Sequence, residues 1–331
     1  MTSESSPRDE PRRPLGLTAF TLEGRAAPAL FVVGWLASLI GLSATLIGTG
    51  AAPGLGKLIL FAIGTALLTI GLVAAAGSQA IERRAAGVTT YAGPSPVLVF
   101  AASVSSTLFL SAVLGNLLLR LGVDPDSPLF ILVGSLIIFA TYLGLIRFLV
   151  VGTGALTWRE MGLHVGRRGF TEDAAWGLAL ALPVLALTGI VASVLSQFLP
   201  LPAPVLPPAT DPAGIALNLA VAAVIAPIGE EIFFRGFTTT AWARLYGTRR
   251  ALVQGAVFFA LAHVLTLGAV DLAEGFKLAL FASIVRLPVA LTLGWVFLQR
   301  RSLVAPIFLH AAYNGIPILA IGAGLANSAG S

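Results

Sequence analysis

The amino-acid sequence predicts an all-α, polytopic bundle of transmembrane helices. Of its 331 residues, 57% are hydrophobic and only 11% are charged, whereas soluble domains carry about 25% charged residues. Several apolar runs reach the roughly 20 residues that a helix needs to cross a bilayer. These runs lack the alternation of polar and apolar residues found in membrane-spanning strands, so we expect helices rather than a barrel.

We expect about nine spans, because turn-forming clusters such as residues 93–96 and 200–212 separate the apolar runs. The first 25 residues are polar, rich in Pro and Arg, and lack the apolar core of a signal peptide. The first span should therefore serve as an uncleaved insertion signal. The predicted spans cover residues 28–49, 57–76, 97–119, 129–150, 174–198, 213–241, 250–268, 274–298 and 303–325.

The charged residues predict the orientation of these spans. Arginines gather in the N-terminal tail and in every second loop, as at Arg83 and Arg84, whereas the alternate loops carry little basic charge. Cytoplasmic loops are enriched in Lys and Arg, so we expect the N-terminus in the cytoplasm and the C-terminus outside. A composition rich in Ala, Gly, Leu and Arg suggests a prokaryotic protein, and therefore a multi-pass protein of the cell membrane.

Four regions follow from this arrangement. They are a polar cytoplasmic tail (1–27), an accessory four-helix membrane region (28–152), an interfacial cytoplasmic loop (153–173) and a membrane core (174–326) that holds the buried acids. The formal net charge of +5 resides mostly in short loops, so it does not indicate nucleic-acid binding. The chain has no cysteine, which excludes disulfides, thiolate catalysis and cysteine-based metal sites.

Three charged residues lie together at membrane depth. Glu230, Glu231 and Arg235 follow an apolar run, although each charge near a helix centre costs about 2.5–3.5 kcal/mol on insertion scales. A rise of 1.5 Å per residue places Glu230 about 16 Å, His263 about 20 Å and Asn314 about 16 Å from the cytoplasmic ends of their spans. His310 lies about 10 Å deep. We therefore expect these residues to meet in one polar cavity, near mid-membrane on the cytoplasmic side.

Spacing within each helix supports this cavity. Residues four positions apart lie on one helix face, and three pairs have this spacing: Glu231 with Arg235, Phe259 with His263, and His310 with Asn314. The adjacent Glu230 and Glu231 point about 100° apart around the helix. One glutamate is therefore expected to face the cavity as a base, while the other is held by Arg235.

Arg286 is the remaining charge near this layer. Its guanidinium could pair with Glu231 or hold the C-terminal carboxylate of a substrate. The alternative is a purely structural pair within the helix bundle.

These side chains suffice for hydrolysis of an amide without a serine or cysteine nucleophile. A carboxylate in a pocket of low dielectric can take a proton from water and return it to a leaving group. Histidine and asparagine side chains can stabilise the oxyanion. The same set could instead bind a divalent metal such as zinc at Glu230, His263 and His310. The sequence contains no His-Glu-x-x-His motif.

The three motifs Glu230-Glu231-x-x-x-Arg235, Phe259-x-x-x-His263 and His310-x-x-x-Asn314 resemble those of the CPBP family of intramembrane proteases. That family includes the type II CAAX prenyl endopeptidases and the bacteriocin-processing and immunity (ABI) proteins. The resemblance covers about residues 213–325. It implies a catalytic core with a conical cavity open to the cytoplasm and the membrane.

The resemblance also implies a role for each matched residue. Glu230 would activate water with help from His263, and His310 and Asn314 would form the oxyanion site. Glu231 and Arg235 would support them. Both metal-dependent and metal-free mechanisms are described for the family, so the cofactor stays open. The implied partner is a peptide or protein substrate, which could be anchored in the lipid bilayer.

Two other functions are compatible with buried charges. An ion-coupled transporter would need further acidic or basic residues toward the outer side, but above the layer the sixth to ninth spans show almost no such group, only the neutral polar Asn218. A non-catalytic membrane scaffold or immunity protein of the same fold would tolerate mutation of the polar residues. The discriminating feature of the endopeptidase is the set of three motifs.

Overall fold

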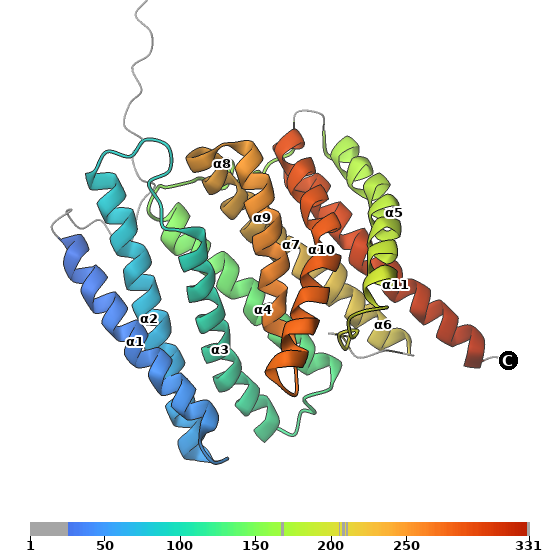
Figure 1. Ribbon diagram of the computed structural model, residues 1–331, viewed down its shortest axis with the longest axis horizontal. Coiled ribbons are helices and arrows are strands. Elements are labelled where there is room, and N and C mark those ends of the chain that lie inside the picture. Colours follow the sequence, from blue (N-terminus) through green and yellow to red (C-terminus); the bar gives the residue numbers. More distant parts are fainter. Residues whose placement is uncertain (1–25, 167–168, 205, 207–208, 210, 330–331) are drawn as a thin grey trace, which may run out of the picture.

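The computed structural model describes residues 26–166, 169–204, 206, 209 and 211–329, with the side chains of 323–329 excepted. These residues form helices and no strand, which confirms the all-α bundle (Figure 1). The helices are α1 (Ala27–Gly50), α2 (Leu55–Ala85), α3 (Pro96–Arg120), α4 (Pro128–Leu145), η2 (Ile146–Val151), α5 (Phe170–Leu195), α6 (Pro212–Leu219), η3 (Ala220–Ile225), α7 (Ala226–Glu230), η4 (Glu231–Thr239), α8 (Thr240–Tyr246), α9 (Thr248–Ala262), η5 (His263–Thr266), α10 (Leu272–Arg300) and α11 (Val304–Ala329).

Within the described residues, eight helices are long and apolar enough to cross a membrane, which corrects the prediction of about nine spans. The predicted span 250–268 forms α9, which has only 15 residues, followed by the 3-10 turn η5. A 15-residue helix covers about 22 Å, less than the roughly 30 Å of a bilayer core. The prediction failed because hydrophobicity continues through Leu265 and Leu267 after the α-helix has ended.

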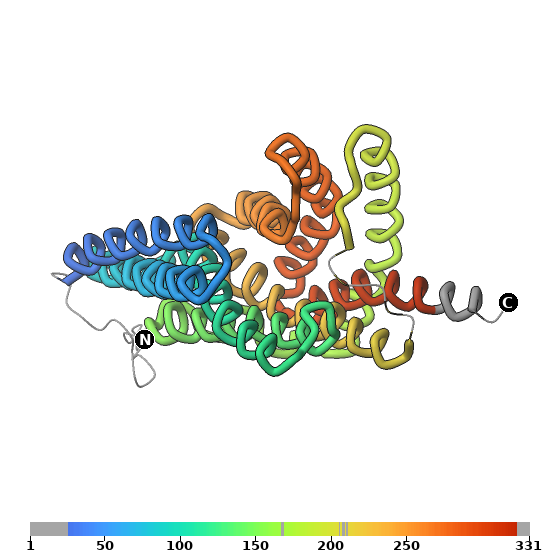
Figure 2. The backbone as a smooth tube through the Cα atoms, turned by 90° about the horizontal axis from the view of Figure 1, so that it is seen from below, coloured from blue at the N-terminus to red at the C-terminus, as the bar shows by residue number. Residues whose placement is uncertain are grey.

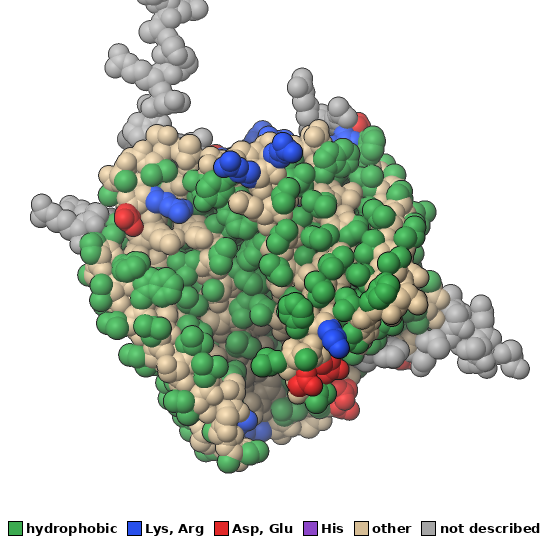
Figure 3. Space-filling model, viewed as in Figure 1, with side chains coloured by type: hydrophobic (Ala, Val, Ile, Leu, Met, Phe, Trp, Pro, Cys, Tyr) green, Lys and Arg blue, Asp and Glu red, His purple; other side chains and the backbone are tan. Residues whose placement is uncertain are grey.

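The described helix ends place basic residues on one side of the bundle. Figure 1 shows the end of α2, the start of α9 and the end of α10 at the same edge of the molecule. These ends carry the pairs Arg83–Arg84, Arg249–Arg250 and Arg300–Arg301. Figure 3 shows a face covered mainly by hydrophobic side chains, as expected for a surface in contact with lipid. The chain is therefore a multi-pass membrane protein, whereas a cytoplasmic N-terminus stays a prediction.

Glycines bring α1 and α2 into close contact at one end of the molecule (Figure 2). A Cβ atom added at Gly41 would lie 2.3 Å from the backbone nitrogen of Leu68, and one at Gly64 would lie 2.5 Å from that of Thr45. Only glycine permits such an approach of two backbones, which is the common way that membrane helices pack.

An aromatic core joins the accessory region to the predicted membrane core. The ring of Phe100 on α3 lies 5.8 Å from Phe233 and 5.9 Å from Phe234 on η4, measured between centroids. Tyr142 on α4 lies 4.6 Å from Phe233. The segment after η2 also enters this core, since Met161 is fully buried. The predicted interfacial loop 153–173 is therefore packed against the bundle, and residues 167–168 of it lie outside the described residues.

Candidate active site

The chain segment that carries both glutamates departs from a regular α-helix. The π-helical segments η3 and η4 flank the short α7, which ends at Glu230. Pro227 lies in α7 and has no backbone N–H to donate. π-Helical turns occur frequently at functional sites, where they re-aim side chains and free backbone groups. The Ala222 carbonyl of η3 shows this effect, because it accepts a hydrogen bond from the Asn314 amide at 2.9 Å.

Glu231 is the centre of a buried ion-pair network. Its Oε1 atom accepts hydrogen bonds from Arg235 Nη1 at 2.9 Å and from His310 Nδ1 at 2.8 Å. The side chains of Glu231 and Arg235 are 0% and 2% exposed. The Arg235 guanidinium lies 4.1 Å from the ring centroid of Phe259 and also donates to the Ala290 carbonyl. The predicted pairing of Glu231 with Arg235 is confirmed, and the network also fixes the ring of His310.

Glu230 points to two histidines from other helices. Its Oε2 atom lies 3.6 Å from His263 Nε2 and 3.9 Å from His310 Nε2. Although this oxygen is buried, it has no hydrogen-bond partner among the described residues. The side chains of Glu230 and His263 are 21% and 23% exposed. The two adjacent glutamates therefore occupy different environments, as their angular separation on the helix predicts.

The hydrogen bonds of the two imidazoles determine what they present to Glu230. His263 Nδ1 lies 2.8 Å from the Phe259 carbonyl, and His310 Nδ1 lies against the Glu231 carboxylate. Both partners accept hydrogen bonds, so Nδ1 carries the proton in each neutral ring and Nε2 presents its lone pair. Three acceptor atoms therefore converge on one point. A water molecule at this point would donate one hydrogen to Glu230 and the other to a histidine.

The residues predicted as metal ligands are Glu230, His263 and His310. One carboxylate and two imidazoles are donors that zinc accepts. Among the described residues, however, no group of three or more His, Asp or Glu side chains is arranged so that it could hold a metal ion. The site as described does not fit a metal, and binding of zinc at Glu230, His263 and His310 stays an untested prediction.

Two predicted site residues lie beside this cluster. The Asn314 side chain is held by η3 through one amide N–H, which leaves its second N–H for another acceptor. Arg286 donates to the Ala282 carbonyl of its own helix at 3.0 Å. It forms no ion pair with Glu231 in the described structure, so of the alternatives that the sequence left open for Arg286 this one is not found. Glu231 is neutralised by Arg235, which is nearer on the same helix.

Sequence reasoning missed two polar residues of α4 that share a cavity with Glu230. Ser135 and Tyr142 line this cavity, which has a volume of about 50 Å³, together with Phe139, Ile225, Ala226 and Gly229. A water molecule needs about 10–15 Å³ and polar partners, so the cavity is large enough to hold water behind Glu230. Tyr142 lies within a predicted span, where a polar side chain gives a weak signal, but only the fold brings α4 against α7.

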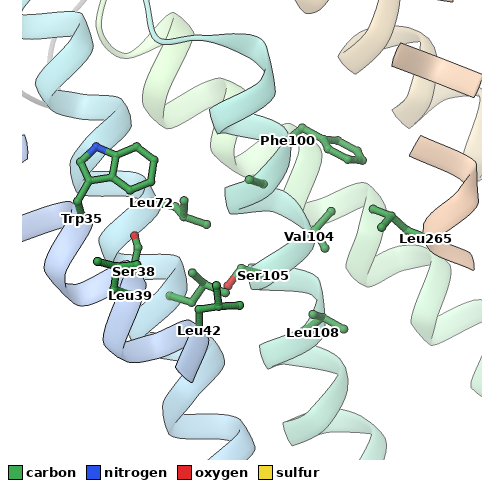
Figure 4. A pocket seen from close by; sticks show the side chains of 12 residues that line it. Trp35, Ser38, Leu39, Leu42, Leu72, Phe100, Val104, Ser105, Leu108 and Leu265 are labelled. Atoms are coloured by element: carbon green, nitrogen blue, oxygen red, sulfur yellow. The ribbon is translucent and has the colours of Figure 1, made fainter. Parts of the chain in front are cut away.

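An apolar groove begins close to His263. It lies between α1, α2, α3 and η5 and has a volume of about 390 Å³. Figure 4 shows Leu265 pointing from η5 toward α3, opposite Val104, with Leu108 further along the groove. Phe100 also lines the groove, and the rings of Phe100, Phe234, Phe259 and His263 follow one another at centroid distances of 5.9, 5.1 and 4.5 Å.

The family comparison agrees with this geometry. Residues 212–316 match the family model described as type II CAAX prenyl endopeptidase Rce1-like. The chain is similar to this family over that segment. The match covers about a third of the chain and includes every residue of the three motifs. It confirms the resemblance to the CPBP and CAAX protease family and indicates a CAAX-protease-like hydrolase in general.

The matched segment begins at α6 and ends within α11, so α1 to α5 lie outside the match. Neither the curated proteins nor the solved structures contain a significant match to the chain. The accessory helices contact the matched segment through Phe100 and Tyr142, whose rings pack against Phe233 and Phe234.

Proposed function

We propose that this protein is an intramembrane endopeptidase in which Glu230 activates a water molecule for attack on a peptide bond. The observation that carries the proposal is the convergence of Glu230 Oε2, His263 Nε2 and His310 Nε2, at 3.6 and 3.9 Å, on one point. All three atoms accept hydrogen bonds, so a water molecule between them could donate one hydrogen to Glu230 and the other to one of the histidines. The match to a protease family supports a peptide as the substrate.

The proposed reaction has two proton transfers. Glu230 takes a proton from the water while the water oxygen bonds to the carbonyl carbon of the substrate. Collapse of the tetrahedral intermediate breaks the carbon–nitrogen bond, and Glu230 returns the proton to the leaving amine. The products are a carboxylic acid and an amine, so the glutamate is regenerated without a covalent enzyme intermediate.

The other residues hold the water and the developing oxyanion. Phe259 and Glu231 fix the rings of His263 and His310 through their Nδ1 atoms. The second amide N–H of Asn314 is a donor that this site offers to an oxyanion, which is the role that the family resemblance implies for this residue. The cavity behind Glu230 would supply water. We infer that the reactive cluster is reached from the cytoplasm, as the family resemblance implies.

Activity should persist in the presence of a metal chelator, because the proposed reaction uses only side chains and water. The measurement is cleavage of a peptide library by the detergent-purified full chain, with and without EDTA, with new termini identified by mass spectrometry. Loss of cleavage in EDTA, restored by zinc, would replace this mechanism with a metal-activated water. Absence of cleavage in both conditions would overturn the endopeptidase and favour the scaffold.

The apolar groove supports a substrate with a membrane anchor. The groove is open to the lipid-facing side of α1 and α3 and ends at Leu265, two residues from His263. An apolar segment of the substrate could therefore lie in the groove while its polar segment reaches Glu230. This arrangement would also give the accessory helices a role in binding.

Filling the groove should impair cleavage of anchored substrates selectively. Leu108→Trp places a large ring in the groove and should raise KM for a peptide with an apolar membrane anchor by about tenfold, the equivalent of about two buried methylene groups. The KM for the same peptide without its anchor should not change. Val113→Trp is the matched control, since Val113 is exposed on the same helix but does not line the groove. An equal effect of both variants would exclude the groove as a binding site.

A further inference from the structure

The buried carboxylate oxygen of Glu230 lacks a hydrogen-bond donor among the described residues. The Nε2 atoms of His263 and His310 lie 3.6 and 3.9 Å from it and are themselves acceptors. The guanidinium of Arg235 is bonded to Glu231. A buried charged group that lacks hydrogen bonds is costly, so the carboxylate needs a donor from outside this set of side chains.

Helix α4 brings two hydroxyl groups to the cavity that Glu230 lines. Ser135 and Tyr142 are seven residues apart on α4, which is two helical turns on one face, and both line this cavity of about 50 Å³. Ser135 Oγ donates to the Ile131 carbonyl at 2.9 Å, and the Tyr142 hydroxyl forms no hydrogen bond to a described residue. A buried water needs about 10–15 Å³ and two to four polar partners. The cavity offers the space and three polar groups.

Packing fixes the Tyr142 ring beside the segment that carries Glu230. The ring lies 4.6 Å from that of Phe233, three residues after Glu230, measured between centroids. A Cβ atom added at Gly229 would lie 2.9 Å from Cδ2 of Phe139 on α4, so a larger residue would push this ring away. Small residues commonly permit such a close approach of membrane helices. The phenol is therefore held next to the base and not on a mobile segment.

We propose that this cavity binds a second water molecule, through which the Tyr142 hydroxyl positions Glu230 as the base. This inference rests on the endopeptidase proposed above. The second water donates one hydrogen to the carboxylate oxygen that points away from the histidines, and it accepts a hydrogen from Tyr142. This bond fixes the plane of the carboxylate, so that Oε2 stays directed at the reactive water. Tyr142 is a positioning residue, because it acts through water and does not touch the substrate.

The proposal gives α4 a part in the active site. All residues of the three motifs lie within the matched segment 212–316, whereas Tyr142 lies outside it, in the accessory region. The accessory region would therefore complete the environment of the base in addition to packing against the core.

The water site is tested by X-ray radiolysis of the full chain in detergent. Hydroxyl radicals formed from bound water oxidise adjacent side chains, and mass spectrometry measures the oxidation of each residue. Tyr142 should be oxidised at least about tenfold faster than Tyr91, because only Tyr142 lines a cavity that can hold water. Tyr91 is 1% exposed and donates its hydroxyl to the Pro94 carbonyl at 2.8 Å.

Filling the cavity should remove this difference. Ala226→Leu places a larger apolar side chain in the cavity and should lower the oxidation of Tyr142 to the level of Tyr91. Ala216→Leu is the matched control, since Ala216 is exposed on α6 and does not line the cavity, and it should change nothing. Gel filtration and thermal unfolding establish that each variant is folded.

The positioning role is tested by Tyr142→Phe, which removes only the hydroxyl. We expect kcat for peptide cleavage to fall about tenfold with KM unchanged, the effect of losing a water-mediated hydrogen bond to a charged group. The oxidation of Phe139, which lines the same cavity, should also fall, which a purely structural role of the hydroxyl would not cause. Tyr246→Phe, at an exposed position on α8, is the control and should leave kcat unchanged.

The alternative outcomes would overturn the inference. Oxidation of Tyr142 no faster than that of Tyr91 would mean that the cavity is dry. Oxidation that persists in folded Ala226→Leu would come from bulk solvent. If Ala226→Leu does not fold, the oxidation of Phe139 in Tyr142→Phe decides the water site. Wild-type kcat in Tyr142→Phe would exclude the positioning role. A wild-type chain that cleaves no peptide would defeat the proposed function, and the oxidation rates would still decide whether the cavity binds water.

Discussion

Glu230→Gln should lower kcat for peptide cleavage by about 10²- to 10⁴-fold, the usual contribution of a general base. Glutamine has nearly the same shape as glutamate but cannot take a proton from water. The effect should fall on kcat rather than KM, because the proton moves only in the transition state. The measurement is the steady-state rate on a peptide identified in the library, with the full chain in detergent.

The same variant should fold normally. Glu230 Oε2 makes no hydrogen bond to a described residue, and the side chain is 21% exposed. Replacing this carboxylate with an amide therefore removes no close ion pair from the described structure. We expect the free energy of unfolding to change by no more than about 0.5 kcal/mol. Glu82→Gln, at an exposed position near the end of α2, is the control for removal of a carboxylate. A Glu230→Gln protein that cleaves at the wild-type rate would show that another group activates the water.

The sequence was sufficient to predict the main contacts of the site. Intervals of four residues placed Glu231 beside Arg235 and Phe259 beside His263, because these pairs lie within single helices whose geometry is nearly constant. Depths calculated from the helical rise brought Glu230 to His263 and His310, on three different helices. Such estimates succeed where the membrane fixes the direction of each helix.

Contacts that depend on irregular backbone or on packing could not be predicted. The hydrogen bond from Asn314 to Ala222 requires the π-helical segment η3. Pro227 indicates irregular backbone here, because it has no N–H to donate, but it does not indicate which side chain binds the free carbonyl. The cavity shared by Tyr142 and Glu230 requires α4 to pack against α7, and nothing in the accessory region indicates this neighbour. The sequence offered two arginines as partners of Glu231. Arg235 forms the ion pair because it lies four residues away on the same chain segment, whereas Arg286 lies on α10.

Glu231→Gln should have the opposite profile to its neighbour, with a large loss of stability. Glu231 and Arg235 are 0% and 2% exposed, and Oε1 accepts from both Arg235 and His310. Neutralising the glutamate leaves the guanidinium as an unpaired buried charge, which typically destabilises a protein by about 3–5 kcal/mol. The measurement is the free energy of unfolding in mixed micelles with an increasing fraction of SDS.

A double variant separates the structural role of this network from its role in positioning His310. Glu231→Gln combined with Arg235→Met removes both charges and keeps apolar volume against Phe259, so most of the lost stability should return. The ring of His310 would still lack its carboxylate partner, and we expect kcat/KM at least about tenfold below wild type. A double variant as active as wild type would mean that Glu231 serves only to neutralise Arg235. A stable but slow enzyme would show that the carboxylate also orients the histidine that faces Glu230.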